Sequence, residues 1–137
     1  MTPSRSCEIY IDGASRGNPG PAGIGVHFAD GWDGAQGLSK YIGETTNNVA
    51  EYAALVYALQ EAVLAGYTDV TIRTDSELLA RQMVGRYRVR DQQLRLLHDF
   101  ARHLSQRLRQ FTIQHIPREK NQLADRLASH AARQHLG

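Results

Sequence analysis

One segment of this chain, TTNNVAEYAALVYAL at residues 45–59, limits the possible folds more than any other. It predicts a helix from about Asn48 to Ala65, and Gly66 is a typical residue at which such a helix ends. Apolar side chains cover nearly the whole circumference of this helix, so it has to be buried on most sides. The rest of the chain must therefore supply elements that enclose it.

The length and composition of the chain predict a single domain over residues 1–137. That length buries one core and is short for two ordinary domains, and 42% apolar residues with both charge signs interspersed are typical of a globular protein. No apolar run approaches the roughly 18 residues that a membrane span needs, and the first residues show no secretory signal. Cys7 is the only cysteine, which excludes an intramolecular disulfide and argues against a cysteine-ligated zinc. We expect a soluble, cytoplasmic monomer with no membrane partner.

The apolar pattern predicts nine elements in the order β β β α β α α β α. The first strand, CEIYID at 7–12, alternates apolar and polar residues, and a loop rich in Gly and Pro leads to a second strand at 24–30, so the two should form an antiparallel hairpin. A third strand is expected between Ala35 and Gly43. The later elements are a strand at 68–75, a helix at 76–83, a helix with an apolar stripe at 91–108, a strand at 111–116, and a helix at 121–134 with Asn121 as its N-cap.

This order predicts the α/β class. The fold should be a five-stranded mixed sheet, in which three antiparallel strands are followed by parallel crossovers, with helices on both faces.

Arginines gather in GRYRVR at 85–90 and again at Arg102, Arg107 and Arg109, although the net charge is only +2. Such clusters would give a positive surface, for which an anionic polymer is a plausible partner. A solvated helix face is the more ordinary explanation of such clusters, and charge alone leaves both interpretations open.

Four carboxylates are expected where elements begin or end. Asp12 ends the first strand, Glu51 lies in the first turn of the central helix, Asp75 ends the fourth strand, and Asp125 lies in the first turn of the last helix. Each has a structural explanation as well. Asp12 can open a turn, Glu51 can form a capping box with Asn48, Asp75 can cap the next helix, and Asp125 can complement a helix dipole.

Taken together, the four carboxylates predict a metal site. Four acidic groups in one place would repel one another strongly unless cations bound there. Ligands that are all oxygen favour Mg²⁺ or Mn²⁺ over zinc. Two such ions about 3.5–4 Å apart suit hydrolysis of a phosphodiester.

Four segments of the chain resemble, in order and spacing, the four acidic motifs of type 1 ribonuclease H: IYIDGASRGNPGPAGIG, TTNNVAEYAAL, IRTDSELL and NQLADRLA. The resemblance covers almost the whole chain. It implies a ribonuclease H-like fold and an endonuclease that cuts the RNA strand of RNA/DNA hybrids, leaving 3′-hydroxyl and 5′-phosphate ends. It also implies two Mg²⁺ ions, with Mn²⁺ as a possible substitute, and metal-binding and catalytic roles for Asp12, Glu51, Asp75 and Asp125.

The same resemblance implies which residues contact the hybrid. Asn18 and Asn48 fall on positions that read its minor groove, and Thr46 falls on a position that contacts a DNA phosphate. The wide, shallow groove of a hybrid displays 2′-hydroxyls on one strand only, so amide side chains can distinguish it from either pure duplex.

The chain departs from the best-known family pattern in four places. Many relatives carry a histidine on a longer loop before the last motif. Here the connection IPREKN is short and has no histidine. Short-loop members of the family place an arginine there, so the resemblance implies a catalytic role for Arg118, with His115 as the alternative. Glu77 stands where many relatives have a groove-contacting glutamine. GRYRVRD replaces a longer basic protrusion, in which Tyr87 could equally be a core residue. We expect no N-terminal hybrid-binding domain.

Two other functions remain open at this level. A non-catalytic nucleic-acid-binding module would keep the fold, although the loss of a carboxylate would be expected and none is lost. A metal nuclease acting on DNA would share the scaffold, although such enzymes do not usually share the GNPG and TTNN segments. The preferred metal, cleavage at single ribonucleotides and the physiological substrate are not readable from the sequence.

Overall fold

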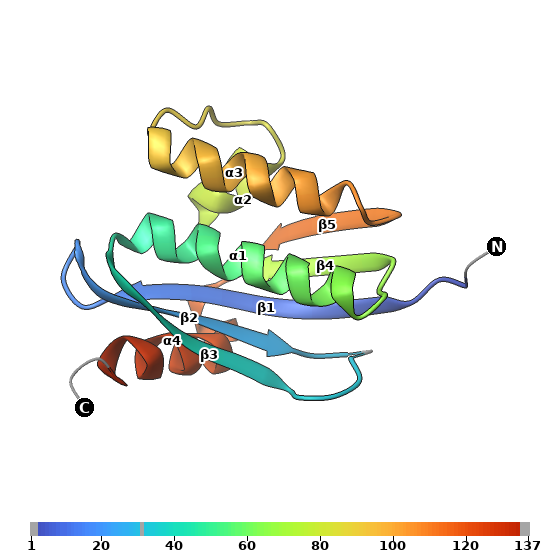
Figure 1. Ribbon diagram of the computed structural model, residues 1–137, viewed down its shortest axis with the longest axis horizontal. Coiled ribbons are helices and arrows are strands. Elements are labelled where there is room, and N and C mark those ends of the chain that lie inside the picture. The colour runs from blue at the N-terminus through green and yellow to red at the C-terminus, as the bar shows by residue number, and fades with distance from the viewer. Residues whose placement is uncertain (1–2, 31, 135–137) are drawn as a thin grey trace.

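The computed structural model, which describes residues 3–30 and 32–134, shows a five-stranded mixed sheet covered by helices on both faces (Figure 1). The elements in chain order are β1 (Ser6–Ser15), β2 (Gly20–Phe28), β3 (Gly37–Thr45), α1 (Asn47–Leu64), β4 (Asp69–Thr74), α2 (Glu77–Met83), α3 (Gln92–Ser105), β5 (Gln110–His115), the short 3₁₀ helix η1 (Arg118–Lys120) and α4 (Gln122–Gln134). The strand order is β3-β2-β1-β4-β5. Pairs β1–β2 and β2–β3 are antiparallel, whereas β1–β4 and β4–β5 are parallel, which confirms the predicted class and topology.

The first three strands differ in their bounds from those predicted. β2 runs from Gly20 to Phe28, so it begins four residues earlier and ends two residues earlier than the predicted 24–30. β3 runs from Gly37 to Thr45, two residues later at each end than expected. β1 continues to Ser15, with Asp12 paired to Gly25 of β2, so Asp12 lies inside the strand and does not open a turn. The hairpin pairing extends the strand beyond the part that alternates in the sequence.

Helix α1 is enclosed as its apolar circumference requires, because it lies between the sheet and α3 (Figure 1). Leu55 and Leu59 are fully buried, and truncating either to alanine would destabilise the fold by about 2–5 kcal/mol. The helix ends as predicted: Gly66 has a φ of +86° and its N–H donates to the Val63 carbonyl at 3.1 Å. Among the described residues no helix, including the 18-residue α1, is long and apolar enough to cross a membrane.

The starts of α1 and α2 lie within one residue of those predicted, but the structural explanations offered for Glu51 and Asp75 do not hold. Thr46 is the N-cap of α1, where its hydroxyl accepts from the Val49 N–H at 3.2 Å. Glu51 therefore falls in the second turn and forms no capping box. In α2 the cap is Ser76 rather than Asp75, and its hydroxyl accepts from a backbone N–H at 3.1 Å. Helix capping thus explains neither carboxylate.

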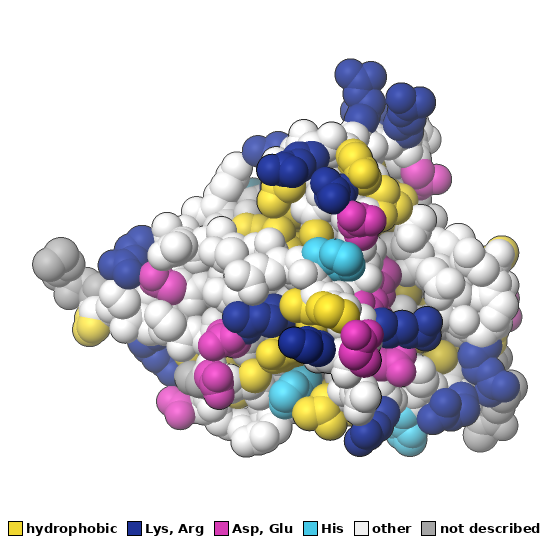
Figure 2. All heavy atoms as spheres, turned by 180° about the vertical axis from the view of Figure 1, so that it is seen from behind, with side chains coloured by type: hydrophobic (Ala, Val, Ile, Leu, Met, Phe, Trp, Pro, Cys, Tyr) yellow, Lys and Arg dark blue, Asp and Glu magenta, His cyan; other side chains and the backbone are white. Residues whose placement is uncertain are grey.

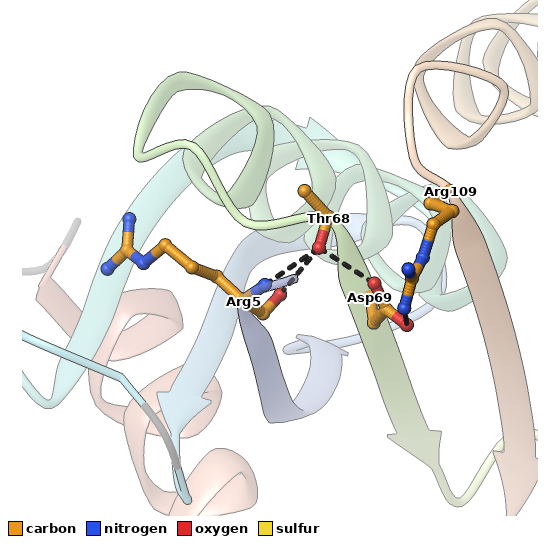
Figure 3. A network of polar contacts seen from close by, with 4 residues as sticks. All are labelled: Arg5, Thr68, Asp69 and Arg109. Carbon is orange, nitrogen blue, oxygen red and sulfur yellow. Dashed lines mark hydrogen bonds and ion pairs between the residues drawn. The ribbon is translucent and has the colours of Figure 1, made fainter. Parts of the chain in front are cut away.

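A network of polar contacts fastens the starts of β1, β4 and β5 (Figure 3). The Thr68 hydroxyl accepts from the Arg5 backbone N–H at 2.8 Å and lies 2.7 Å from a carboxylate oxygen of Asp69. Arg109 donates to the other oxygen of Asp69, also at 2.8 Å. At this end of the sheet, charged side chains are therefore paired and hold neighbouring strands in register.

Candidate active site

The predicted carboxylates meet at the opposite end of the sheet. β1 and β4 run parallel with Ile11 beside Thr74, so the residues that follow these two, Asp12 and Asp75, lie side by side. A cleft of about 530 Å³ opens there. The cleft is lined by residues that include Asp12, Glu51, Asp75, Asp125, Arg118 and Asn47. The fold thus brings together all four carboxylates and the arginine proposed beside them.

Gly13 is what allows Glu51 to approach Asp12. A Cβ atom on Gly13 would lie inside the backbone of Ala50 and Glu51, so only glycine lets β1 touch the start of α1 this closely. The Gly13 N–H donates a hydrogen bond to the Glu51 carboxylate. That bond holds a buried acidic side chain, 8% exposed, in the cleft.

Three of the carboxylates have the spacing of a metal site. Oxygen atoms of Asp12, Glu51 and Asp75 all lie within 4.8 Å of one another. Ligands on opposite sides of an octahedral Mg²⁺ are about 4.2 Å apart, so small movements would bring these oxygens into its coordination sphere. Asp125, in the first turn of α4 as predicted, lines the same cleft outside this group of three.

Burial and mutual repulsion disfavour the ionised forms of the two most buried carboxylates. Burial, followed by the charge of Glu51, raises the pKa of Asp12 to about 10. Burial also raises the pKa of Glu51 to about 7, although the hydrogen bonds from Asp12 and Gly13 oppose the rise. A bound divalent cation would favour ionisation of both groups, and a donor set made only of carboxylate oxygens suits a hard cation.

Asn121 is a residue of this site that the sequence did not reveal. Its position before α4 agrees with the predicted N-cap, because its carbonyl accepts from the Asp125 N–H at 3.1 Å. Its side chain, however, turns into the protein and donates to the Ile11 carbonyl at 2.8 Å and to Asp75 at 3.1 Å. The predicted side-chain cap is therefore wrong.

Asn47 is a second residue missed by sequence reasoning. Its side-chain oxygen accepts from the N–H and the hydroxyl of Ser15, both at 2.9 Å, and its own N–H donates to the side-chain oxygen of Asn18 at 3.0 Å. The start of α1 is thereby tied to the loop after β1. The two adjacent asparagines in TTNN were the only signal, and the helix start decides which of them faces this loop.

The other predicted contacts lie on exposed surface near the cleft. Asn18 and Asn48 are exposed, on the β1–β2 loop and in the first turn of α1, and Thr46 is half-buried. Arg118 is exposed on η1. His115, at the end of β5, is also exposed but is not among the described residues that line the cleft.

The structure also shows the contacts of two residues at which the chain departs from the family pattern. Glu77 forms an exposed ion pair with Arg81, one helical turn on, at 2.9 Å. Tyr87 is 48% exposed with the Arg81 guanidinium 5.4 Å from its ring, so it is not a core residue.

Basic side chains crowd the edge formed by α3 and the segment before it. Figure 2 shows them at the top of the molecule, above the sheet. Arg86, Arg88 and Arg90 are exposed on this edge, as is Arg102 on α3. Arg109 is different, because it is paired with Asp69 at the far end of the sheet.

A mixed sheet of this order, with four carboxylates gathered in a cleft where β4 ends beside β1, defines an α/β protein with a candidate site for hard metal ions. Residues 10–131 match the family model described as "Reverse transcriptase-like". The chain belongs to this family, as a domain of the type 1 ribonuclease H kind.

Known relatives are similar to this chain in both sequence and structure. A protein named ribonuclease HI from Halobacterium salinarum is 44% identical over 124 residues, which are 89% of this chain and 62% of the relative. The chain thus spans less than two thirds of that relative's length. The RNase H1 crystal structure from Halobacterium salinarum has a TM-score of 0.85 at 42% identity, covering 92% of this chain and 96% of that one. LC11-RNase H1 in complex with an RNA/DNA hybrid has a TM-score of 0.88 at 43% identity, covering 96% and 99%.

Proposed function

We propose that this protein is an endoribonuclease that hydrolyses the RNA strand of RNA/DNA hybrids with two Mg²⁺ ions, leaving 3′-hydroxyl and 5′-phosphate ends. The convergence of three carboxylates within 4.8 Å, in a cleft that a fourth also lines, carries this proposal. A relative 43% identical to this chain has been crystallised with such a hybrid, which supports the substrate.

Asp12, Glu51, Asp75 and Asp125 are the proposed metal-binding and catalytic residues. Divalent ions bound there would activate a water and offset charge on the leaving oxygen. The protein contributes rigidity, because Asp12 and Asp75 sit at adjacent strands and Glu51 is fixed by the Gly13 N–H. Mg²⁺ is the proposed ion and Mn²⁺ a substitute, since both favour oxygen ligands.

Arg118 is the proposed catalytic arginine in place of the loop histidine. It lines the cleft from η1 and carries a permanent positive charge, which suits it to stabilise a phosphate as charge develops in the transition state. His115 is the alternative, although it does not share the cleft lining.

Asn18, Asn48 and Thr46 are the proposed substrate contacts. The side-chain oxygen of Asn18 is engaged by the Asn47 N–H, so its NH₂ group is the part suited to donate to acceptors in the minor groove. Because the wide groove and its 2′-hydroxyls distinguish the hybrid, base sequence should matter little. Arg86, Arg88 and Arg90 would then grip phosphates in a salt-dependent way.

The proposal extends to the context of the enzyme. We place the activity in a single domain over residues 1–137, acting as a monomer in the cytoplasm.

Cleavage of labelled nucleic acid tests the proposal. RNA/DNA, RNA/RNA and DNA/DNA duplexes of one sequence are incubated with the protein in Mg²⁺, in Mn²⁺ and in chelator. We expect metal-dependent cutting of the RNA strand of the hybrid alone, with a 5′-phosphate on the new end. An intact hybrid in both metals would favour a non-catalytic binding module, and cutting of the DNA duplex would favour a different nuclease.

A further inference from the structure

Asn121 is an unusually buried polar residue next to the carboxylates. Its side chain is only 1% exposed, and its amide oxygen has no hydrogen-bond partner among the described residues. It lies between η1, which carries Arg118, and α4, which carries Asp125. Since the side chain does not cap α4, its burial requires another explanation.

The orientation of the Asn121 amide is fixed by its two partners. Both the Ile11 carbonyl, at 2.8 Å, and the Asp75 carboxylate, at 3.1 Å, are acceptors. Turning the amide over would place its oxygen against two other oxygens, so the NH₂ group must face them and both of its hydrogens are used.

The backbone of Asn121 contacts the other two functional residues of this corner. Its N–H donates to the Arg118 carbonyl at 2.9 Å, and its carbonyl accepts from the Asp125 N–H at 3.1 Å. Ile11, whose carbonyl the side chain binds, directly precedes Asp12. One residue therefore joins the segments that carry Asp12, Asp75, Arg118 and Asp125.

We propose that Asn121 is a positioning residue that holds the Asp75 carboxylate in the orientation in which it shares a cation with Asp12 and Glu51. The inference rests on the metal site proposed above. A metal site needs its ligands held within about 0.5 Å of the productive geometry, and an N–H bond to one carboxylate oxygen limits rotation of the whole group. Hydrogen bonds that orient metal ligands typically contribute 10- to 100-fold to metal affinity or activity.

The test is the affinity for Mn²⁺ of Asn121→Leu, measured without nucleic acid by electron paramagnetic resonance. Leucine has the branched shape of asparagine, although it is larger, and it donates no hydrogen bond to Asp75. We expect the dissociation constant for Mn²⁺ to rise about 10- to 100-fold. Cleavage should fall at low Mn²⁺ and recover as Mn²⁺ is raised, while the KM for the hybrid changes little.

Gln82→Met is the matched control, because Gln82 is another buried amide, 5% exposed, that accepts from the Tyr52 hydroxyl at 2.6 Å. It should lower the melting temperature while Mn²⁺ affinity stays at the wild-type value. A purely structural role for Asn121 would make the two variants alike, with lower melting temperatures and unchanged affinity, and would overturn the proposal.

Two further comparisons distinguish a failure of the role proposed for Asn121 from a failure of the variant to fold and from a failure of the metal site itself. If Asn121→Leu does not fold, Asn121→Ser replaces it, since serine is too short to reach Asp75, and unchanged Mn²⁺ affinity in this variant refutes the inference equally. If the wild-type protein itself binds no Mn²⁺, the metal site is refuted along with the role of Asn121. Wild-type binding with an unaltered variant refutes only the role of Asn121.

Discussion

The acidic residues at the two ends of the sheet lie in opposite electrostatic environments. At the end where β4 and β5 begin, Arg109 pairs with Asp69 at 2.8 Å, and hydrogen bonds from Arg109 and Thr68 lower the pKa of Asp69. At the end where β1 and β4 finish, burial and neighbouring carboxylates raise the pKa of Asp12 and Glu51. Among the described residues, no ion pair includes a carboxylate of the cleft.

This difference separates charges that serve the fold from charges that serve the site. A paired carboxylate stabilises the strands it joins, whereas unpaired and buried carboxylates destabilise the folded protein until a cation binds. Perturbed carboxylates in a cleft are typical of functional sites. The fold can retain the acidic end because the rest of the sheet is well packed and its opposite end is well paired.

Asp12→Asn removes one carboxylate from the acidic end of the sheet and should have the largest effect. Cleavage should fall by more than about 100-fold, beyond what is typical for residues that only support a metal ligand. In chelator at pH 8 the melting temperature should rise, because each unit by which burial raises the pKa of Asp12 corresponds to about 1.4 kcal/mol. Asp75→Asn should lose activity as well. Substantial cleavage by either variant, measured on the labelled hybrid, would contradict the assignment.

Replacing Arg86, Arg88 and Arg90 with glutamine tests whether the exposed basic edge extends the site. Each arginine that contacts one phosphate contributes about 0.9 to the magnitude of the slope of log binding constant against log salt concentration. The slope of the triple variant should therefore be smaller in magnitude by up to about 2.7. Binding to the hybrid is measured at several salt concentrations in chelator, so that cleavage does not interfere. A slope equal to that of the wild type would place the hybrid elsewhere on the surface.

The arrangement of the fold was predictable because it depends on repeating patterns. The alternation in β1 and the apolar circumference of α1 each involve many residues, and burial acts on all of them in the same direction. The antiparallel and parallel pairings followed from the element order, whereas the strand order β3-β2-β1-β4-β5 was not predicted. Only η1, three residues long, was not anticipated.

Single-residue contacts were less predictable. Thr46 and Asn48 are both good capping residues, and the choice between them depends on where the chain leaves β3. The role of Asn121 depends on a partner 110 residues away, Ile11, which no local pattern identifies. The carboxylates themselves could be named from the sequence, but only the parallel register of β1 and β4 brings Asp12 beside Asp75.

Arg118→Ala removes the positive group that lines the acidic cleft and should have an intermediate effect. We expect kcat to fall about tenfold with little change in KM, because the charge acts on the transition state more than on the bound hybrid. His115→Ala is the natural comparison, since that residue is exposed near the cleft without lining it. If the histidine variant is the slower of the two, the roles are reversed.

The melting temperature in chelator should depend on pH through the acidic end. Glu51 titrates near 4.3 in an unfolded chain and at about 7 in the folded protein. Its contribution to stability is complete below about pH 4 and is lost as the pH rises through about 7, and the raised pKa of Asp12 extends the loss to higher pH. The melting temperature should therefore fall between about pH 5 and pH 8.

Mg²⁺ should remove most of this fall, because the ion binds the ionised carboxylates of the folded protein and so stabilises it. The two thermal series, with Mg²⁺ and with chelator, are recorded in the same buffers. Parallel curves would mean that the acidic end binds no cation under these conditions.

Asp69→Asn makes the same chemical change at the paired end and should have the smallest effect. Here the substitution removes an ion pair with Arg109 instead of a repulsion, so the melting temperature should fall slightly, opposite in sign to the change in Asp12→Asn. The fall should shrink in high salt, which screens an exposed pair. Because Asp69 lies at the far end of β4 from the cleft, the cleavage rate and the Mn²⁺ affinity should stay at wild-type values. A loss of activity in this variant would mean that the two ends of the sheet are coupled, and the division between charges for the fold and charges for the site would fail.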